Sequence, residues 1–224
     1  MPIKKIIAIG SAKGGVGKSS ITALLALSLS KHKKVGILDA DIYGPNQNIL
    51  FRLDSKNTIL NKKIMPAEKK GIKIISMGNI LNYDDAAIWR GPMLSGAIKK
   101  LINDTVWDNL DYLLIDMPPG TGDAYLTVFK ELIIDEFILI TTPNKLAISD
   151  TQKTITMLRK LNINILGFIS NNIFNVKNFD DSFFLSNKID HLGTYEFDKN
   201  ILDLNLDFNC LVSNKISKVI MSDV

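Results

Sequence analysis

The segment GSAKGGVGKSS, at residues 10–20, combines glycines, two lysines and serine hydroxyls in an order that suits phosphate binding. Gly14, Gly15 and Gly17 allow the backbone to curl, so that its N–H groups form an anion cradle with the start of the next helix. Lys18 would place its charge on the β- and γ-phosphates of a nucleotide, and the Ser19 hydroxyl would bind Mg²⁺. The residues that we expect to contact ATP or ADP are Gly14, Gly15, Val16, Gly17, Lys18, Ser19 and Ser20.

This loop departs at one position from the general phosphate-loop pattern G-x-x-x-x-G-K-[ST]. The pattern asks for glycine where this chain has Ala12. The alternative is a glycine-rich turn between a strand and a helix, with lysines that bind nothing. The apolar run IIAI before the loop and the helical pattern after it favour nucleotide binding, because strand, loop and helix all agree with it.

Three carboxylates lie at the ends of two later strand-like runs. In ILDADIYGP, Asp39 and Asp41 are two residues apart, so an extended backbone would point both side chains the same way. Asp116 ends the run LLID. We expect Asp39 and Asp116, with Ser19, to hold a hydrated Mg²⁺, and Asp41 to orient the water that attacks the γ-phosphate. The structural alternatives are acidic loop residues for the first pair and a turn cap for Asp116.

Two asparagines close the later run FISNN, at residues 168–172. A side-chain amide at this place could hydrogen-bond the edge of an adenine ring, and we assign that contact to Asn171. The choice between Asn171 and Asn172 stays open, because asparagine also caps strands and turns.

Near-continuous apolar runs, without alternation, indicate parallel strands that are covered on both faces. They lie at residues 5–10, 34–40, 72–78, 111–117, 136–142 and 163–170. Helical patterns separate several of them, at residues 18–31, 93–104, 123–133 and 148–161. This alternation predicts an α/β fold: a doubly wound, mostly parallel sheet with helices on both faces and a ligand site at the carboxyl ends of the strands.

The length of 224 residues and the hydrophobic content of 46% predict one domain over residues 1–224, with an irregular segment at about 171–190. The net charge of +4 comes from scattered lysines, so we do not expect a nucleic-acid partner. No apolar run reaches the length of about 18 residues that indicates a membrane span. The start, MPIKKIIAIG, favours a strand over a signal peptide. We therefore expect a cytoplasmic protein without membrane contact.

Cys210 is the only cysteine, which excludes an internal disulfide. The chain has two histidines, His32 and His191, and no Cys-x-x-Cys pair, so a self-contained zinc site is not expected. The apolar neighbours of Cys210 predict a buried thiol.

Taken together, the motifs resemble a known group of P-loop NTPases. KGGVGKS, with the early Lys13, resembles the deviant Walker A loop of the MinD/ParA/nitrogenase-iron-protein class of ATPases. DADIYGP, WRGPM at residues 89–93 and DMPPGTGD resemble the Mrp/ApbC branch of that class, the iron–sulfur cluster carriers. The match in order and spacing covers about residues 4–171, and TTPNKLAISDTQK at 141–153 is similar to the next helix of that branch.

The resemblance implies different tasks for the two lysines. Lys18 serves the phosphates of its own subunit, whereas Lys13 reaches across a homodimer to the partner's nucleotide. The charge of Lys13 would then stabilise the developing phosphate charge as an arginine finger does. The implied activity is slow, Mg²⁺-dependent ATP hydrolysis, with Lys13, Lys18 and Asp41 as catalytic residues.

The resemblance also implies an iron–sulfur cluster, and there the chain departs from it. Carriers of this branch have a Cys-x-x-Cys motif after the strand that here ends FISNN, but residues 171–193 contain no cysteine. A shared cluster needs about four thiolates, and a homodimer would offer one Cys210 from each chain. Asp180 and Asp181 are hard ligands and poor substitutes. We expect no stable cluster, or a labile one that depends on an outside thiol, a cysteine-bearing partner subunit or an apo iron–sulfur client protein.

Two other functions stay open. One is a nucleotide-gated positioning or scaffold switch of the MinD/ParA kind, which an amphipathic C-terminal membrane helix would favour. The last stretch, NKISKVIMSDV, has apolar residues at 216, 219, 220 and 221. The other is a nucleotide-binding structural protein without hydrolysis, which the lysine, serine and aspartates of the motifs disfavour.

Overall fold

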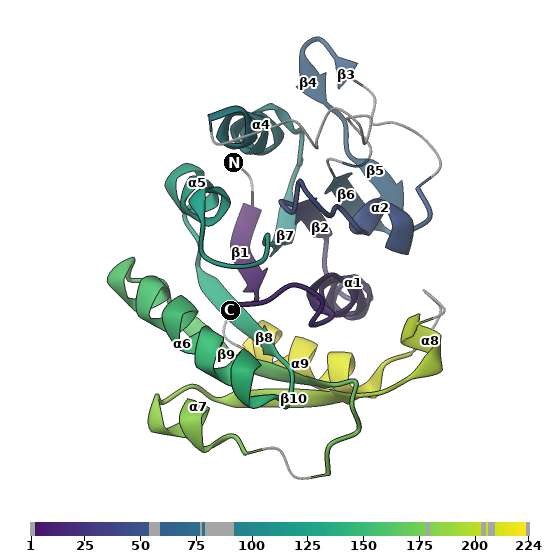
Figure 1. Ribbon diagram of the computed structural model, residues 1–224. Coiled ribbons are helices and arrows are strands. Elements are labelled where there is room, and N and C mark those ends of the chain that lie inside the picture. Colours follow the sequence, from purple (N-terminus) through teal and green to yellow (C-terminus); the bar gives the residue numbers. More distant parts are fainter. Residues whose placement is uncertain are drawn as a thin grey trace.

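The computed structural model describes residues 3–53, 59–76, 78, 92–177, 180–202, 205 and 209–222. Within these residues, one sheet of eight strands carries helices on both faces (Figure 1). Its strand order is β10-β9-β8-β1-β7-β2-β6-β5. Neighbouring strands pair in parallel except at one edge, where β5 runs antiparallel to β6. The predicted doubly wound α/β architecture is confirmed.

The strands of this sheet are β1 (Ile3–Gly10), β2 (Val35–Asp39), β5 (Ala67–Lys69), β6 (Ile72–Ser76), β7 (Leu110–Asp116), β8 (Glu136–Thr141), β9 (Ile165–Asn172) and β10 (His191–Glu196), and a separate hairpin joins β3 (Ile59–Leu60) to β4 (Lys63–Ile64). The helices are α1 (Lys18–Leu29), α2 (Gln47–Leu50), α4 (Pro92–Asp104), α5 (Asp123–Glu131), α6 (Lys145–Lys160), α7 (Ser182–Ser186), α8 (Lys199–Leu202) and α9 (Leu211–Ser222). All six predicted strands and four predicted helices are present, with ends within three residues of the prediction.

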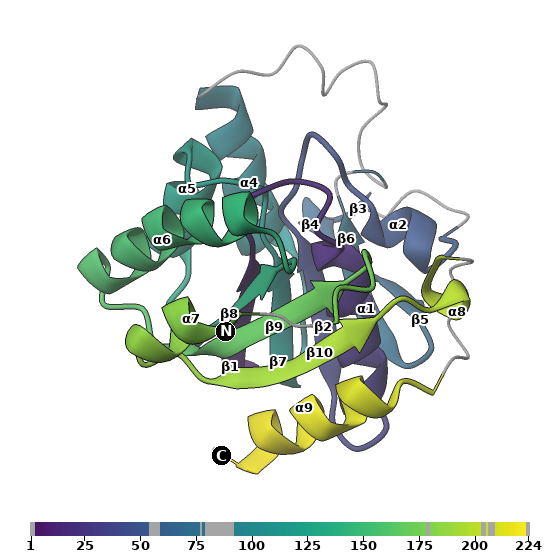
Figure 2. The same cartoon turned by 60° about the horizontal axis from the view of Figure 1, so that its bottom comes forward.

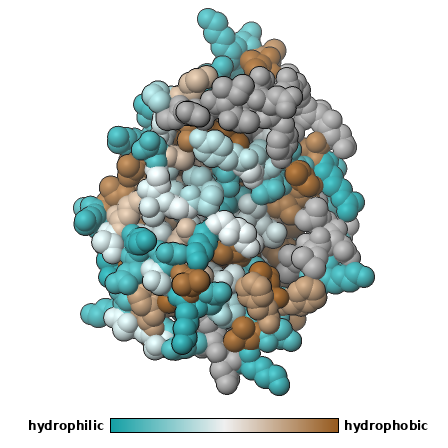
Figure 3. Space-filling model, viewed as in Figure 1, coloured by the Kyte–Doolittle hydropathy of each residue, from teal (hydrophilic) through white to brown (hydrophobic). Residues whose placement is uncertain are grey.

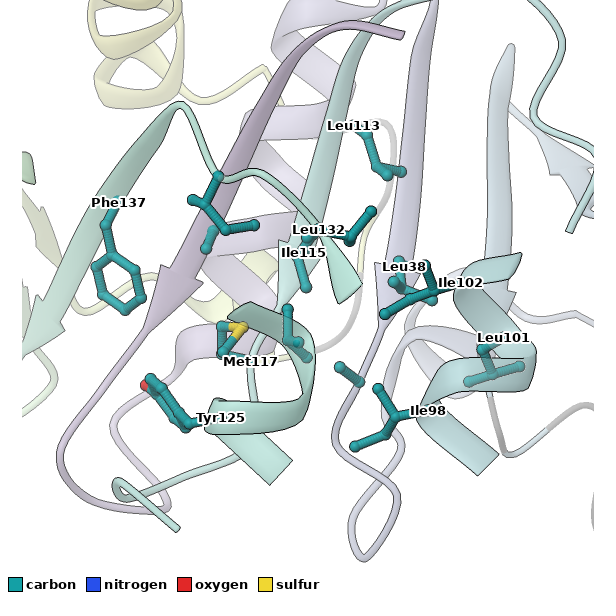
Figure 4. Close-up of a cluster of buried hydrophobic side chains, with 14 of the residues drawn as sticks. Leu38, Ile98, Leu101, Ile102, Leu113, Ile115, Met117, Tyr125, Leu132 and Phe137 are labelled. Atoms are coloured by element: carbon teal, nitrogen blue, oxygen red, sulfur yellow. The ribbon is translucent and has the colours of Figure 1, made fainter. Parts of the chain in front are cut away.

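Two hydrophobic cores hold these layers together. α1 and α9 cover one face of the sheet, where Ile7 and Ile9 of β1 pack with Leu25 of α1 and Ile216 of α9 (Figures 1 and 2). α4, α5, α6 and α7 cover the other face. Figure 4 shows part of this second core, where side chains from α4 and α5 meet those of β7. Burial on both faces explains the near-continuous apolar runs of the central strands. On the outer surface in Figure 3, apolar side chains lie in small groups among hydrophilic ones.

The segment at 171–190 is more regular than we predicted. β9 continues through Asn172, whose side chain closes the following turn by accepting from Val176 N at 2.8 Å and donating to Val176 O at 3.1 Å. Helix α7 then packs the buried Phe184 ring on Phe168 of β9, with 3.9 Å between ring centroids. These two anchors depend on contacts that local composition does not reveal, and the described residues between them form turns and irregular backbone.

Of the WRGPM motif, Trp89, Arg90 and Gly91 lie outside the described residues, while Pro92 and Met93 begin α4. β10, α9 and the short elements β3, β4, β5, α2, α7 and α8 were not among the predicted strands and helices. Each of the short elements has too few residues to show a hydrophobic period.

The apolar residues near the C-terminus belong mostly to the core. Ile216 and Ile220 of α9 are fully buried against α1 and the sheet, whereas Val219 is 40% exposed. Ser217 Oγ also donates to Ser28 Oγ of α1 at 2.6 Å. The apolar side of α9 is therefore not free to enter a membrane. Among the helices described, none combines the length and the apolar character needed to cross a bilayer.

We predict that Ile216→Ala lowers the free energy of unfolding by about 3 kcal/mol, because it leaves a cavity between α9 and the sheet. Val219→Ala, on the exposed side of the same helix, also replaces a β-branched residue by alanine. It should lower the free energy of unfolding by less than about 1 kcal/mol. Urea unfolding of both variants checks this. Equal losses would show that α9 does not pack as described.

Candidate phosphate-binding site

The loop between β1 and α1 forms the floor of a cavity of about 380 Å³. Gly15 and Gly17 have φ of 76° and 83°, a region that glycine enters at little cost. Gly17 also lies so close to the Asn171 side-chain amide that a Cβ would collide with it. No side chain caps the start of α1, so its first N–H groups remain available to an anion.

Most of the predicted contact residues line this cavity. Gly14, Gly15, Gly17, Lys18, Ser19 and Ser20 do so, together with Lys13, Asp41 and Pro119. Val16 differs, because its side chain is buried in the core beside α1. Only its backbone faces the site region: its carbonyl oxygen accepts from Asn171 Nδ2 at 2.9 Å.

A buried ion pair joins the loop to β7. Lys18 Nζ lies 2.5 Å from Asp116 Oδ1, and the two side chains are 7% and 0% exposed. Burial by itself would lower the pKa of Lys18, but the Asp116 carboxylate, with Asp41 and Asp39 further away, raises it above its usual value. Lys18 is therefore positively charged, and the Asp116 carboxylate compensates this charge.

Asp39 lies beside this pair, because Asp39 of β2 and Asp116 of β7 are direct partners in the parallel register. Asp39 is fully buried, and its Oδ2 accepts from the backbone N–H groups of Asn46 and Gln47, each at 3.1 Å, and from Ser76 Oγ at 3.0 Å. Burial and the adjacent Asp116 carboxylate raise the pKa of Asp39 to about 8, while the Gln47 N–H group opposes the rise. Asp39 thus holds the start of α2 beneath the cavity.

Asp41 is placed differently from Asp39. It follows the end of β2 at Asp39, and its backbone N–H donates to Asp39 Oδ1 at 3.2 Å. Asp41 lines the cavity, and its Oδ1 accepts from Gly44 N at 3.1 Å. Burial raises the pKa of Asp41, and the Lys18 charge acts in the opposite direction.

The two asparagines at the end of β9 have separate tasks. Asn171 supports the phosphate loop through Val16 O, and it lines a neighbouring cavity of about 290 Å³ with Ile173 and Phe197. Asn172 closes the turn after β9 and donates to Glu196 Oε2 at 2.7 Å. Of the two, Asn171 is the one beside a space that could hold a nucleotide base.

Lys13 is engaged within its own chain. Its Nζ lies 3.2 Å from Asp150 Oδ2 of α6, and the side chains are 40% and 36% exposed. An ion pair with this exposure contributes at most about 1 kcal/mol, so a competing anion can displace it.

Two residues of the site, Gln47 and Tyr125, belong to no sequence motif and were not predicted. The Gln47 side chain, 0% exposed, bridges Asp116 and the Ser19 carbonyl. The buried Tyr125 hydroxyl of α5 lies so close to Gly10 that any Cβ at that position would collide with it. The sequence shows both only as ordinary members of a loop and a helix, because their partners are distant along the chain.

No group of three or more His, Cys, Asp or Glu side chains in the described residues is arranged to hold a metal alone. The aspartates of the site are instead engaged by Lys18, Gln47 and backbone N–H groups. Cys210, which is buried as predicted, lies elsewhere: it lines another cavity with Leu24 and Leu27 of α1. The site therefore presents Lys18 and the Ser19 hydroxyl beside the carboxyl groups of Asp39, Asp41 and Asp116, a donor set that suits hydrated Mg²⁺ only once phosphate oxygens are added.

The raised pKa of Asp39 predicts a specific pH dependence for the ligand-free protein. Between about pH 4 and 8 the unfolded chain has lost the Asp39 proton while the folded chain keeps it, so stability falls as pH rises, by up to about 1.4 kcal/mol per unit. Asp39→Asn removes this loss. The stability of the variant relative to wild type should therefore rise from pH 5 to pH 7 and level off above about pH 8. Urea titrations across this range check it, and a constant difference would contradict it.

Comparisons with known proteins agree with this geometry. A model of the protein family described as ParA: NUBPL iron-transfer P-loop NTPase matches residues 2–198. An iron–sulfur cluster carrier protein of Pseudomonas fragi is 44% identical over 173 residues, which are 75% of this chain and 60% of that protein. One of Rickettsia conorii is 46% identical over 177 residues, 79% of this chain and 56% of that protein. The chain thus spans somewhat more than half the length of these relatives.

Solved structures share the fold. The nucleotide-binding protein of Archaeoglobus fulgidus, solved in complex with ADP, matches with a TM-score of 0.77 and 33% sequence identity. The match covers 96% of this chain and 88% of that protein's chain. The cell division ATPase MinD of Pyrococcus furiosus has a TM-score of 0.78 at 20% identity, covering 98% of this chain and 99% of its own, and shows likeness of fold alone. With its nucleotide-binding P-loop fold, this chain belongs to the ParA/NUBPL family of iron-transfer P-loop NTPases.

Proposed function

We propose that this chain binds Mg-ATP in the phosphate-loop cavity and hydrolyses it slowly, as the nucleotide-dependent part of an iron–sulfur cluster transfer system. The observation that carries the proposal is the convergence of the open loop, Lys18 and Asp41 on one cavity, with Asp39 and Asp116 buried beside Lys18. Its support from outside the chain is that relatives at about 45% identity are named iron–sulfur cluster carrier proteins.

The nucleotide phosphates take the place beside Lys18. The N–H groups from Gly14 to Ser20 receive the phosphate oxygens, and Lys18 exchanges Asp116 for the β- and γ-phosphates. Asn171 lies at the neighbouring cavity, which takes the base. Because loop and cavity are already formed, little ordering is needed on binding.

Mg²⁺, when bound, neutralises the charge of the β- and γ-phosphates. Ser19 would bind it directly, while Asp39 and Asp116 would hold its waters, since Mg²⁺ keeps several waters and takes few carboxylates. Asp41, which lines the cavity, orients the attacking water and accepts its proton. The raised pKa of Asp41 suits this task better than that of a freely exposed carboxylate.

The trans role of Lys13 needs a second copy of the chain. In the single chain Lys13 rests on Asp150, and this exposed pair is weak enough to open when a partner's phosphates arrive. A homodimer formed through the phosphate-loop face would then complete both sites at once. Turnover would be slow at low protein concentration, because each site lacks one cation until the copies meet.

The iron–sulfur cluster is cargo and not a resident cofactor of this chain, because a homodimer does not supply enough thiolates to hold it. Cys210 lies by Leu24 and Leu27 of α1, at least about 9 Å along that helix from Lys18. A dimer joined at the phosphate loops leaves the two thiols far apart, whereas a cluster wants about four thiolates in one place. Thiolates from a cysteine-bearing partner subunit or an apo client protein would therefore hold the cluster.

A nucleotide-gated positioning switch without a cluster is the second candidate. Cys210 lies away from the phosphate loop. This position agrees equally well with a switch that has no cluster and with a cluster held by the thiolates of a partner protein. The membrane form of this switch is disfavoured, because Ile216 and Ile220 of α9 are buried. ATP-dependent pelleting with liposomes, in the absence of iron, would favour the switch.

We expect Lys18→Ala to weaken binding of Mg-ADP by about 2–3 kcal/mol, because a charge-assisted contact is lost. The change also leaves Asp116 buried without its cation, so Lys18→Gln, which can still donate to Asp116, is measured beside it. Lys100→Ala, an exposed lysine of α4, is the control. Calorimetry at 25 °C gives the affinities, and an unchanged value in folded Lys18 variants would refute the nucleotide site.

Lys13→Ala should lose both ATP turnover and ATP-dependent dimerisation while it still binds ATP. Lys153→Ala is the matched control, because Lys153 also faces Asp150, at 3.8 Å, but is 80% exposed and lies outside the cavity. Phosphate release and sedimentation are the measurements. Normal turnover by a monomeric Lys13→Ala protein would exclude the trans role.

Anaerobic reconstitution with iron and sulfide should give no cluster that survives desalting in the homodimer, for lack of thiolates. Cys210→Ser should behave in the same way as wild type. A stoichiometric, desalting-resistant cluster that persists in Cys210→Ser would show that this chain binds iron through other residues.

A further inference from the structure

Gln47 joins three parts of the phosphate-binding site. Its side-chain Nε2 donates to Asp116 Oδ2 at 2.8 Å and to the Ser19 carbonyl oxygen at 3.0 Å. Its backbone N–H donates to Asp39 Oδ2 at 3.1 Å. One residue thus contacts β7, the first turn of α1 and the end of β2, which carry the residues expected to hold Mg²⁺.

The orientation of this side chain follows from its partners. A carboxylate and a carbonyl oxygen can only accept, so the amide nitrogen must face both of them. The amide oxygen, Oε1, is consequently turned away, and it is buried without a hydrogen-bond partner in the part of the chain that the structure describes.

Asp116 divides its two oxygens between different partners. Oδ1 is bound by Lys18 and Oδ2 by Gln47. When Lys18 turns to phosphate, Oδ1 loses its partner while Gln47 still holds Oδ2 and the plane of the carboxylate. Asp116 therefore keeps its orientation, and its Oδ1 is free to accept a hydrogen bond from a new donor. The water molecules that surround Mg²⁺ are donors of this kind.

We propose that Gln47 is a positioning residue for Mg²⁺: its amide nitrogen holds Asp116 and the Ser19 backbone in the positions from which they contact the hydrated metal. This rests on the proposed binding of Mg-nucleotide. Groups that orient the partners of a metal typically change its affinity by about 10- to 100-fold when removed. Gln47 is also the first residue of α2.

The composition of the chain allows a direct test on the wild-type protein. Gln47 and Gln152 are the only glutamines, so selective ¹⁵N labelling yields two side-chain amide groups. Gln152 is exposed on α6 and serves as the internal reference. With ADP bound in the presence of a chelator, Mg²⁺ is then added stepwise. We expect the Gln47 amide signals to shift saturably and their hydrogen exchange to slow several-fold, while the Gln152 signals stay in place.

Gln47→Met tests the same inference through affinity. It keeps the length of the side chain and removes both donor and acceptor, so Mg²⁺ should bind the ADP complex about tenfold more weakly, a larger loss of affinity than the one measured for metal-free ADP. Gln152→Met is the control and should match wild type in both values.

Several results would overturn the inference. Gln47 signals that respond to ADP but not to Mg²⁺ would do so, as would equal Mg²⁺ affinity in folded Gln47→Met and wild type. If Gln47→Met loses the same ADP affinity with and without metal, Gln47 supports the structure of the site and does not act on Mg²⁺ in particular. If Gln47→Met does not fold, the wild-type titration still decides. Failure of the wild-type protein to bind ADP at all would instead remove the proposed function itself.

Discussion

The Lys18 ammonium group lies 2.5 Å from Asp116 Oδ1, in a buried space that also holds the carboxylates of Asp39 and Asp41. A buried ion pair adds little net stability, but removing one partner costs several kcal/mol, typically about 3–5. Here the carboxylates outnumber the lysine, and backbone N–H groups and Gln47 compensate for the excess. The site is thus held together by contacts that the phosphates and metal of a Mg-nucleotide are suited to replace.

The sheet creates this arrangement through its strand order. β1, β7 and β2 are neighbours, so the phosphate loop after β1 emerges next to the ends of the two strands that carry Asp116 and Asp39. The parallel register makes these two aspartates direct partners, and their repulsion together with burial raises the pKa of Asp39. Helix α5 adds the Tyr125 hydroxyl beneath Gly10, a contact that only glycine permits. The positions of the charges follow from the fold, whereas their compensation follows from individual side chains.

The hydrophobic runs predicted the central strands and major helices well, because residues buried on both faces of a sheet leave a local signal. The phosphate loop and its aspartates were also recognisable, since nucleotide chemistry restricts their spacing. Gln47, the Lys13–Asp150 pair and the remote burial of Cys210 could not be predicted, because each depends on partners far along the chain. The anchors of α7 and the turn after β9 were missed for the same reason.

We infer that the Lys18–Asp116 ion pair is a resting contact, which the phosphates of a nucleotide replace. The most direct measurement is the distance between Lys18 Nζ and Asp116 Oδ1 in a crystal structure of the wild-type protein with Mg²⁺ and a non-hydrolysable ATP analogue. We predict that this distance exceeds hydrogen-bonding range, about 3.5 Å, with Lys18 on a phosphate oxygen and Gln47 still on Asp116. Phosphates bound in the cavity with the ion pair intact would contradict the claim.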